Sequence, residues 1–216
     1  MSNPVILLGC GGHAKVVYDA LCLNGLDVIG VVDTSQPKGT EVFSSLKVLG
    51  GDDIIFEYSP TTIDLALGVG ALPGIFNRQK LFNKFTDRGY RFKTLVHPSS
   101  TIASSVVLKM GVQVMAGAII QADSIIEENC IINTSASIDH DCRVGRHSHL
   151  APRSVLCGGV QLEENVFIGA GAVVIQNLII KHKAIIGAGT MINIDVNEGL
   201  TVYTDRKLIT YTGGDV

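Results

Sequence analysis

An aliphatic residue recurs at every sixth position from Val96 to Ile192, and this period restricts the possible folds more than any other feature. Each of these positions holds Val, Ile or Leu, and the position four residues later holds nothing larger than Leu. A period of six fits neither a helix nor a simple alternating strand. It is typical of hexapeptide repeats, which form a parallel β-helix. We expect the triangular left-handed form, because an unbroken run of this length disfavours a sandwich with chance spacing.

Composition narrows the functional classes. The chain has 216 residues, of which 46% are hydrophobic, which is enough for a full core and predicts two domains. A net charge of −3 gives no basic field, so nucleic acid is not an expected partner. No apolar run reaches the length of a membrane span and no leader pattern opens the sequence, which predicts a cytoplasmic protein without membrane contact.

The five cysteines are odd in number and include no CxxC pair, which argues against a disulfide framework or a structural zinc site. Cys130 and Cys142 fall in the small slot of the repeat, and we expect both to be core residues.

The first ninety-five residues have a different hydrophobic pattern, which predicts apolar strands that alternate with helical segments. The pattern predicts strands over residues 5–8, 28–32, 47–49, 63–67 and 91–95, and helices over 13–24, 52–58 and 76–88. This order is typical of a small Rossmann-like α/β unit. We therefore expect an α/β domain over residues 1–95, a left-handed β-helix over 96–197 and a C-terminal tail over 198–216. His97 precedes a proline, which marks the boundary.

A glycine-rich turn, Gly9-Cys10-Gly11-Gly12-His13-Ala14, lies between the first predicted strand and helix. It matches the dinucleotide-binding fingerprint, with Asp33 at the place of the ribose-binding acid. The domain is too short for a second mononucleotide half, so a mononucleotide or nucleotide-sugar site fits better, with phosphates at the helix N-terminus. A plain tight turn is the alternative. The candidate contacts are Gly11, Gly12, His13, Asp33, Thr34 and Gly68.

Within the repeat, His140 and Asp141 stand at positions that point away from the core. Three histidines fall within ten residues here, a concentration that packing does not require. A carboxylate beside an imidazole fixes its tautomer and raises its basicity, which suits a general base.

The segment INTSASIDHDCRVGRHSHLAP, with VMAGAIIQADSIIEENC before it and GCGGHAKVV near the N-terminus, closely resembles the PglD/NeuD-like nucleotide-sugar acetyltransferases. The similarity extends to about Val196. Members join a Rossmann-like domain that holds a nucleotide-sugar to a left-handed β-helix that forms a trimer. The resemblance implies that His140 is the base for an amine or hydroxyl attacking acetyl-CoA, and that Asp141 orients it.

The same resemblance implies further site residues. Asn133 would lie near the acceptor, and His149 would line the acetyl end of the pocket. The amide of Gly158 would face the thioester oxygen. Amides near Ala170 and Ala188 would bind the pantetheine arm in a groove between neighbouring protomers of a homotrimer.

The quoted segments look most like enzymes for 4-amino-4,6-dideoxy-sugars such as perosamine and viosamine, which implies N-acetylation of a UDP-, GDP- or dTDP-linked amino-sugar for surface polysaccharide (O-antigen) synthesis. O-acetylation of a sialic acid is the nearest alternative. Alternatives of another class are a non-catalytic nucleotide-sugar binder and a zinc enzyme like the γ-class carbonic anhydrases. For the latter, His140, His147 and His149 fall on different faces of the repeat, so we expect no metal.

The C-terminus departs from the family pattern. Members usually end in a Val-Gly-x-Pro-Ala-Lys motif, whereas this chain reads GLTVYTDRK from Gly199 and lacks the turn proline. Arg206 or Lys207 would then be the candidates for contact with the phosphates of CoA.

Overall fold

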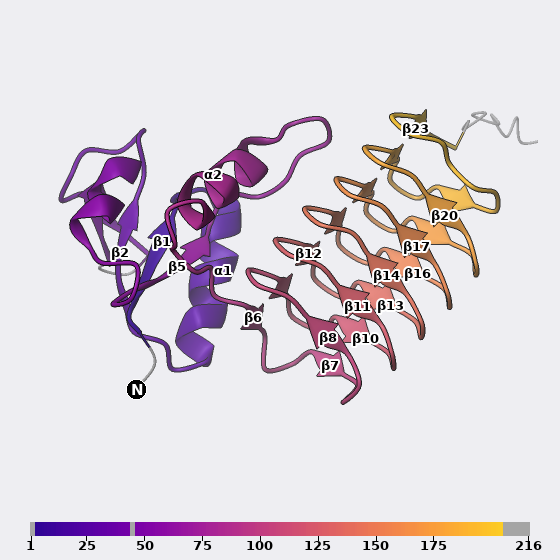
Figure 1. The fold of residues 1–216 in the computed structure, drawn as a ribbon, viewed down its shortest axis with the longest axis horizontal. Coiled ribbons are helices and arrows are strands. Elements are labelled where there is room, and N and C mark those ends of the chain that lie inside the picture. Colours follow the sequence, from indigo (N-terminus) through magenta and orange to yellow (C-terminus); the bar gives the residue numbers. More distant parts are fainter. Residues whose placement is uncertain (1–2, 44–45, 205–216) are drawn as a thin grey trace, which may run out of the picture.

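A computed structural model describes residues 3–43 and 46–204 of the chain, as an α/β domain followed by a row of stacked coils (Figure 1). The α/β domain holds a five-stranded sheet in the order β3-β4-β2-β1-β5. Its strands are β1 (Val5–Leu8), β2 (Val28–Val32), β3 (Glu41–Val42), β4 (Leu46–Gly50) and β5 (Asp64–Leu67). All neighbours are parallel except β3 and β4.

Helices cover both faces of this sheet. They are α1 (Gly12–Leu23), the 3₁₀ helix η1 (Asp52–Glu57) and α2 (Asn77–Thr86). Val5 and Leu7 pack with α1 residues, whereas Ile6 and Leu8 pack with Phe82 of α2 and other residues on the opposite face. Burial on both faces explains why β1 is a continuous apolar run rather than an alternating one.

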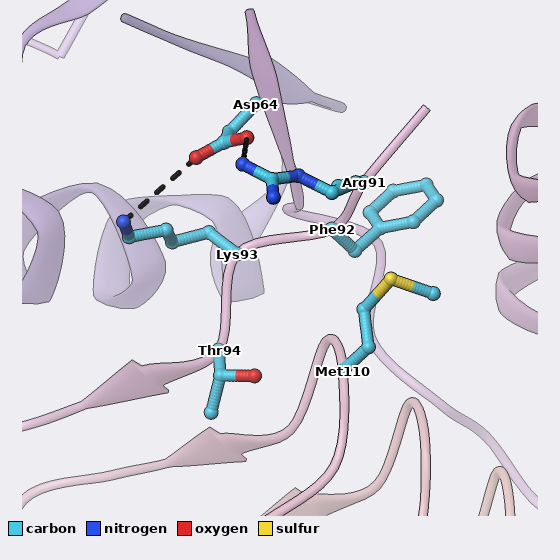
Figure 2. Close-up of a pocket in the computed structure, with 6 residues that line it drawn as sticks. All are labelled: Asp64, Arg91, Phe92, Lys93, Thr94 and Met110. Carbon is cyan, nitrogen blue, oxygen red and sulfur yellow. Dashed lines mark hydrogen bonds and ion pairs between the residues drawn. The ribbon is translucent and has the colours of Figure 1, made fainter. Parts of the chain in front are cut away.

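One predicted strand is wrong. Residues 91–94 form no strand: Phe92 makes only an isolated bridge to Leu65, and the next strand begins at Leu95. The buried carboxylate of Asp64 instead holds the segment, with Arg91 at 3.3 Å and Lys93 at 3.8 Å, as Figure 2 shows. These side chains tie the linker to the outer edge of the sheet while the chain turns into the first coil.

The β-helix consists of strands of two residues each. They are β6 (Leu95–Val96), β7 (Thr101–Ile102), β8 (Val107–Leu108), β9 (Gln113–Val114), β10 (Ile119–Ile120), β11 (Ile125–Ile126), β12 (Ile131–Ile132), β13 (Ser137–Ile138), β14 (Arg143–Val144), β15 (His149–Leu150), β16 (Val155–Leu156), β17 (Gln161–Leu162), β18 (Phe167–Ile168), β19 (Val173–Val174), β20 (Ile179–Ile180), β21 (Ile185–Ile186), β22 (Met191–Ile192) and β23 (Thr201–Val202). The last of these lies within the stretch expected to be a tail.

These strands stack into three parallel sheets. Sheet 1 has the order β22-β19-β16-β13-β10-β7, sheet 2 the order β20-β17-β14-β11-β8, and sheet 3 the order β23-β21-β18-β15-β12-β9-β6. The chain visits sheets 1, 2 and 3 in turn, and each coil pairs in register with the next. The predicted fold class, an α/β domain followed by a parallel β-helix, is confirmed.

The hexad pattern locates the core correctly. A single hydrophobic cluster runs through the coils and contains the aliphatic slot together with most of the small slot. Cys130 and Cys142 are buried in it, as expected. Many corners contain a non-glycine residue with positive φ, and Asp141, at φ 59°, is one of them. Within the described residues, no helix is long and apolar enough to cross a membrane.

Candidate functional site

His140 and Asp141 project from the corner between sheets 1 and 2. His140 Nδ1 lies 2.7 Å from Asp141 Oδ2, and the two side chains are 61% and 65% exposed. Because an ionised carboxylate only accepts, Nδ1 carries the proton and Nε2 keeps its lone pair. The hydrogen bond that His140 donates to Asp141, followed by the charge of Asp139, raises the pKa of His140. The expected outward orientation is confirmed, and the pair has the arrangement of a general base with an orienting acid.

Gly158 lies directly beside this imidazole, one coil further along the β-helix. A Cβ atom added to Gly158 would come within 2.7 Å of both Cε1 and Nε2 of His140. The surface pocket around them continues to Gln176 and Asn177 of the next coil. The predicted amide donor and the predicted base are therefore neighbours, with open space alongside them.

A second row of predicted residues lies at the corner between sheets 3 and 1. Asn133, Ala170 and Ala188 all lie at this corner, with Ala170 and Ala188 on successive coils and Asn133 two coils before Ala170, and both alanines are exposed. The row is continuous, because Gly189 N donates to Ala170 O at 2.8 Å. Sheet 1 separates this row from His140 and Gly158. One chain alone thus does not bring all the predicted site residues together.

His149 joins the second row to the α/β domain. Its Nδ1 lies 3.0 Å from Ala71 O, and its Nε2 lies 3.1 Å from Asn133 Nδ2. A carbonyl oxygen only accepts, so Nδ1 carries the proton and Nε2 accepts from Asn133. Burial lowers the pKa of His149 to about 4. The ring is therefore a neutral hydrogen-bonding group held in one orientation.

The six predicted nucleotide-sugar contacts gather at the carboxyl ends of β1, β2 and β5. Asp33 Oδ2 accepts from Cys10 N at 2.9 Å, and Oδ1 accepts from Ser35 N at 2.8 Å. Partial burial alone would raise the pKa of Asp33, but hydrogen bonds from Cys10 and Ser35 lower it to about 2. Thr34, between them, is exposed.

The three glycines among these contacts, Gly11, Gly12 and Gly68, differ in the space around them. No atom lies within 4 Å of a Cβ built on Gly11 or Gly12, so the start of α1 is open to a ligand. A Cβ on Gly68 would approach Ala14 Cβ to 2.6 Å and Leu8 O to 2.8 Å. Close packing of α1 against the sheet therefore accounts for Gly68, whereas the first two leave room for phosphate at a helix N-terminus.

His13 faces the β-helix. Its Nε2 lies 2.9 Å from Gln113 Oε1, and burial followed by the charge of Arg78 lowers its pKa to about 4. It is therefore a neutral ring and not a cation for phosphate. Neither Gln113 nor Arg78 was predicted, because their contacts depend on how the α/β domain docks on sheet 3. The buried Arg78 donates from Nη1 to Val69 O at 2.8 Å.

The histidines of the zinc alternative have separate partners: His140 pairs with Asp141, His149 with Asn133, and His147 Nδ1 lies 2.9 Å from Asn129 Nδ2. Within residues 3–43 and 46–204, no group of three or more His, Cys, Asp or Glu side chains could hold a metal ion.

The buried histidines predict that mild acid destabilises the fold. His13, His147 and His149 each have a pKa of about 4, mainly because burial disfavours the charged form. The unfolded chain protonates near its ordinary value, so it binds more protons than the folded chain between about pH 6.5 and 4. This part of the stability is fully present above about pH 6.5 and is lost as the pH falls.

Urea unfolding at pH 7.5 and pH 5 measures the effect. We expect a smaller free energy of unfolding at pH 5, and a smaller difference between the two pH values in His147→Asn, whose side chain tolerates the positive φ of 61° at that corner. Equal stability at both pH values in the wild type would contradict the assignment.

Comparisons with known proteins agree with the geometry. The PglD N-terminal domain family matches residues 4–85. The chain is 30% identical over 112 residues to the GDP-perosamine N-acetyltransferase of Escherichia coli O157:H7, a match covering 52% of this chain and only 50% of that relative.

Solved structures match over nearly the whole chain. A histidine-to-alanine mutant of the Caulobacter crescentus GDP-perosamine N-acetyltransferase, in complex with CoA and GDP-perosamine, is 36% identical, with 93% of each chain covered and a TM-score of 0.83. The acetyltransferase domain of PglB from Neisseria gonorrhoeae is 28% identical, with coverage of 93% and 96% and a TM-score of 0.80. On its sequence motifs, its fold and these relatives, the chain belongs to the PglD/NeuD-like family of sugar acetyltransferases.

Proposed function

We propose that the protein transfers the acetyl group of acetyl-CoA to the 4-amino group of a nucleotide-linked 4-amino-4,6-dideoxy-sugar, for surface-polysaccharide synthesis in the cytoplasm. The observation that carries this proposal is the exposed His140–Asp141 pair beside Gly158. It lies on a chain that shares 36% of its residues with an enzyme solved with CoA and GDP-perosamine. Transfer to an amine needs no covalent enzyme intermediate, so placement is the protein's main contribution.

In the proposed reaction, His140 Nε2 takes a proton from the sugar amine as its nitrogen attacks the thioester carbonyl carbon. The carbonyl oxygen gains negative charge, and the neighbouring Gly158 N–H is the candidate donor for it. Collapse of the tetrahedral intermediate then forms the amide, breaks the carbon–sulfur bond and returns the proton from His140 to the leaving thiolate. Asp141 holds the Nδ1–H tautomer throughout.

A cyclic homotrimer would complete this site. Sheet 1 lies between the row of His140 and Gly158 on one edge and the row of Ala170 and Ala188 on the other. Its outward-facing strand positions carry no charge and include four apolar side chains, Ile119, Val155, Val173 and Met191. Packing sheet 1 around a threefold axis would bury these side chains and bring opposite edges of neighbouring protomers together.

Sheet 2 is a poorer candidate for that interface. Its outward face carries a charged residue, Arg143, which pairs with Glu127. Sheet 3 is partly covered by the α/β domain, which buries Gln113, Ile131 and His149. In the trimer, CoA would lie along Ala170 and Ala188 of one protomer, beside His140 of the next. The nucleotide-sugar would extend from the open start of α1.

The direct test is to incubate the protein with acetyl-CoA and each of a panel of UDP-, GDP- and dTDP-linked 4-amino-4,6-dideoxy-sugars. Release of the free thiol of CoA measures the transfer. We expect thiol release with at least one amino-sugar and none with its 4-hydroxy analogue. Reaction with a sialic acid but with none of the amino-sugars would show that the chain is instead an O-acetyltransferase. Nucleotide binding without any transfer would favour a non-catalytic binder.

The pH dependence of kcat/KM tests the base. His140 must be neutral to accept a proton, so activity should fall as the pH drops through its pKa, which lies above the ordinary value of about 6.5. Asp141→Asn removes the main cause of that shift, so the acid limb should move to lower pH. The maximal rate should also fall.

His140→Ala should lower kcat by about 10²–10⁴-fold, whereas His182→Ala, on a different corner, should leave it unchanged. If the fall of kcat/KM at low pH occurs at the same pH in Asp141→Asn as in the wild type, a group other than His140 causes it.

A further inference from the structure

The loop that leaves β5 is held at both ends by side chains of the β-helix. Gln113 Nε2 donates to Leu67 O at 2.8 Å, and His149 Nδ1 donates to Ala71 O at 3.0 Å. Gln113 and His149 belong to one outward column of sheet 3, because both are in register with Ile131 of β12. They are two strand spacings apart, about 9.6 Å. The loop therefore runs along the β-helix with its ends fixed at two levels.

Gln113 also holds the start of α1. Because Leu67 O only accepts, the NH₂ group of Gln113 faces it, and Gln113 Oε1 accepts from His13 Nε2 at 2.9 Å. Gln113 is only 2% exposed. This one amide thus joins three elements: the end of β5, the first turn of α1 and strand β9 of the β-helix.

The loop is held from its other side as well. Arg78 of α2 is buried, and its Nη1 donates to Val69 O at 2.8 Å and to Leu67 O at 3.4 Å. Leu67 O therefore receives two donors, one from each domain. A side chain from each domain therefore fixes the position of the end of β5.

We propose that Gln113 is a positioning residue, which sets where the acceptor nucleotide-sugar lies relative to the β-helix. The proposal rests on the proposed function. Its two partners are His13 and Leu67, and the neighbours of these residues, Gly12 and Gly68, are candidate nucleotide-sugar contacts. Gln113 touches no reacting atom and acts through the loop and α1. The positions of Ala170 and Ala188, the proposed CoA contacts at a corner of the β-helix, do not depend on Gln113.

Two substitutions separate its two hydrogen bonds. Gln113→Leu removes both, whereas Gln113→Glu keeps the acceptor for His13 and loses the donor to Leu67 O. Gln79→Leu is the matched control, because Gln79 makes a different contact between the domains, from its Nε2 to Glu164 Oε1 at 3.2 Å.

Steady-state kinetics with both substrates, with thermal unfolding alongside, give the readout. We expect Gln113→Leu to raise KM for the nucleotide-amino-sugar at least tenfold while KM for acetyl-CoA changes less than twofold. Gln113→Glu should raise KM for the nucleotide-amino-sugar by less than Gln113→Leu does, and Gln79→Leu should have the KM values of the wild type. The proposal is overturned if Gln113→Leu leaves both KM values unchanged. It is also overturned if the substitution changes both KM values and kcat to the same extent and lowers the melting temperature.

Binding measurements distinguish failure of this proposal from failure of the proposed function. If the wild type acetylates no amino-sugar, the function fails, and calorimetry with GDP, UDP and dTDP still tests Gln113. At least tenfold weaker binding of the preferred nucleotide by Gln113→Leu would support positioning. An unchanged Kd, or no nucleotide binding by the wild type, would overturn it.

Discussion

Close packing inside a narrow triangular coil is the constraint on which this structure depends. Strands of two residues cannot stand alone, so each coil is stable only because the next one pairs with it and shares its aliphatic interior. The same stacking aligns the corners into rows. His140, Gly158 and Gln176 follow one another along one row, and Asn133, Ala170 and Ala188 lie along another, with one coil between Asn133 and Ala170. Stacking of the coils therefore supplies an extended, regularly spaced surface, along which we propose that acetyl-CoA lies.

The histidines of this protein differ in burial and in pKa, according to their surroundings. His13, His147 and His149 are buried and neutral, and each is hydrogen-bonded at or near the contact between the domains. His140 is exposed and paired with a carboxylate, which raises its pKa. The general-base role proposed for His140 needs an accessible and basic ring, whereas the buried histidines are uncharged hydrogen-bonding groups.

The repeat could be predicted from sequence because its signal is local: one aliphatic slot and one small slot specify the core of each coil. The outward orientation of His140 and Asp141 followed from the same count. The predicted strand at 91–95 shows the limit, because only Phe92 bridges to Leu65, and Leu95 pairs instead with Gln113 of the β-helix. Gln113 could not be found from sequence, since it resembles any polar residue on an outward strand position until the α/β domain covers it. Arg206 and Lys207 lie outside the described residues, so their proposed contact with CoA stays a prediction.

The central proposal is that each active site combines the His140 row of one protomer with the Ala188 row of the next. Subunit complementation measures this most directly. His140→Ala removes the proposed base, and Ala188→Trp would obstruct the exposed corner along which CoA is proposed to lie, so each variant alone should be nearly inactive. Refolded together in equal amounts, they should recover about a quarter of the wild-type activity, because one pairing in four joins an intact row to an intact row across the boundary. Activity no greater than the sum of the separate variants would show that each chain carries its own complete site.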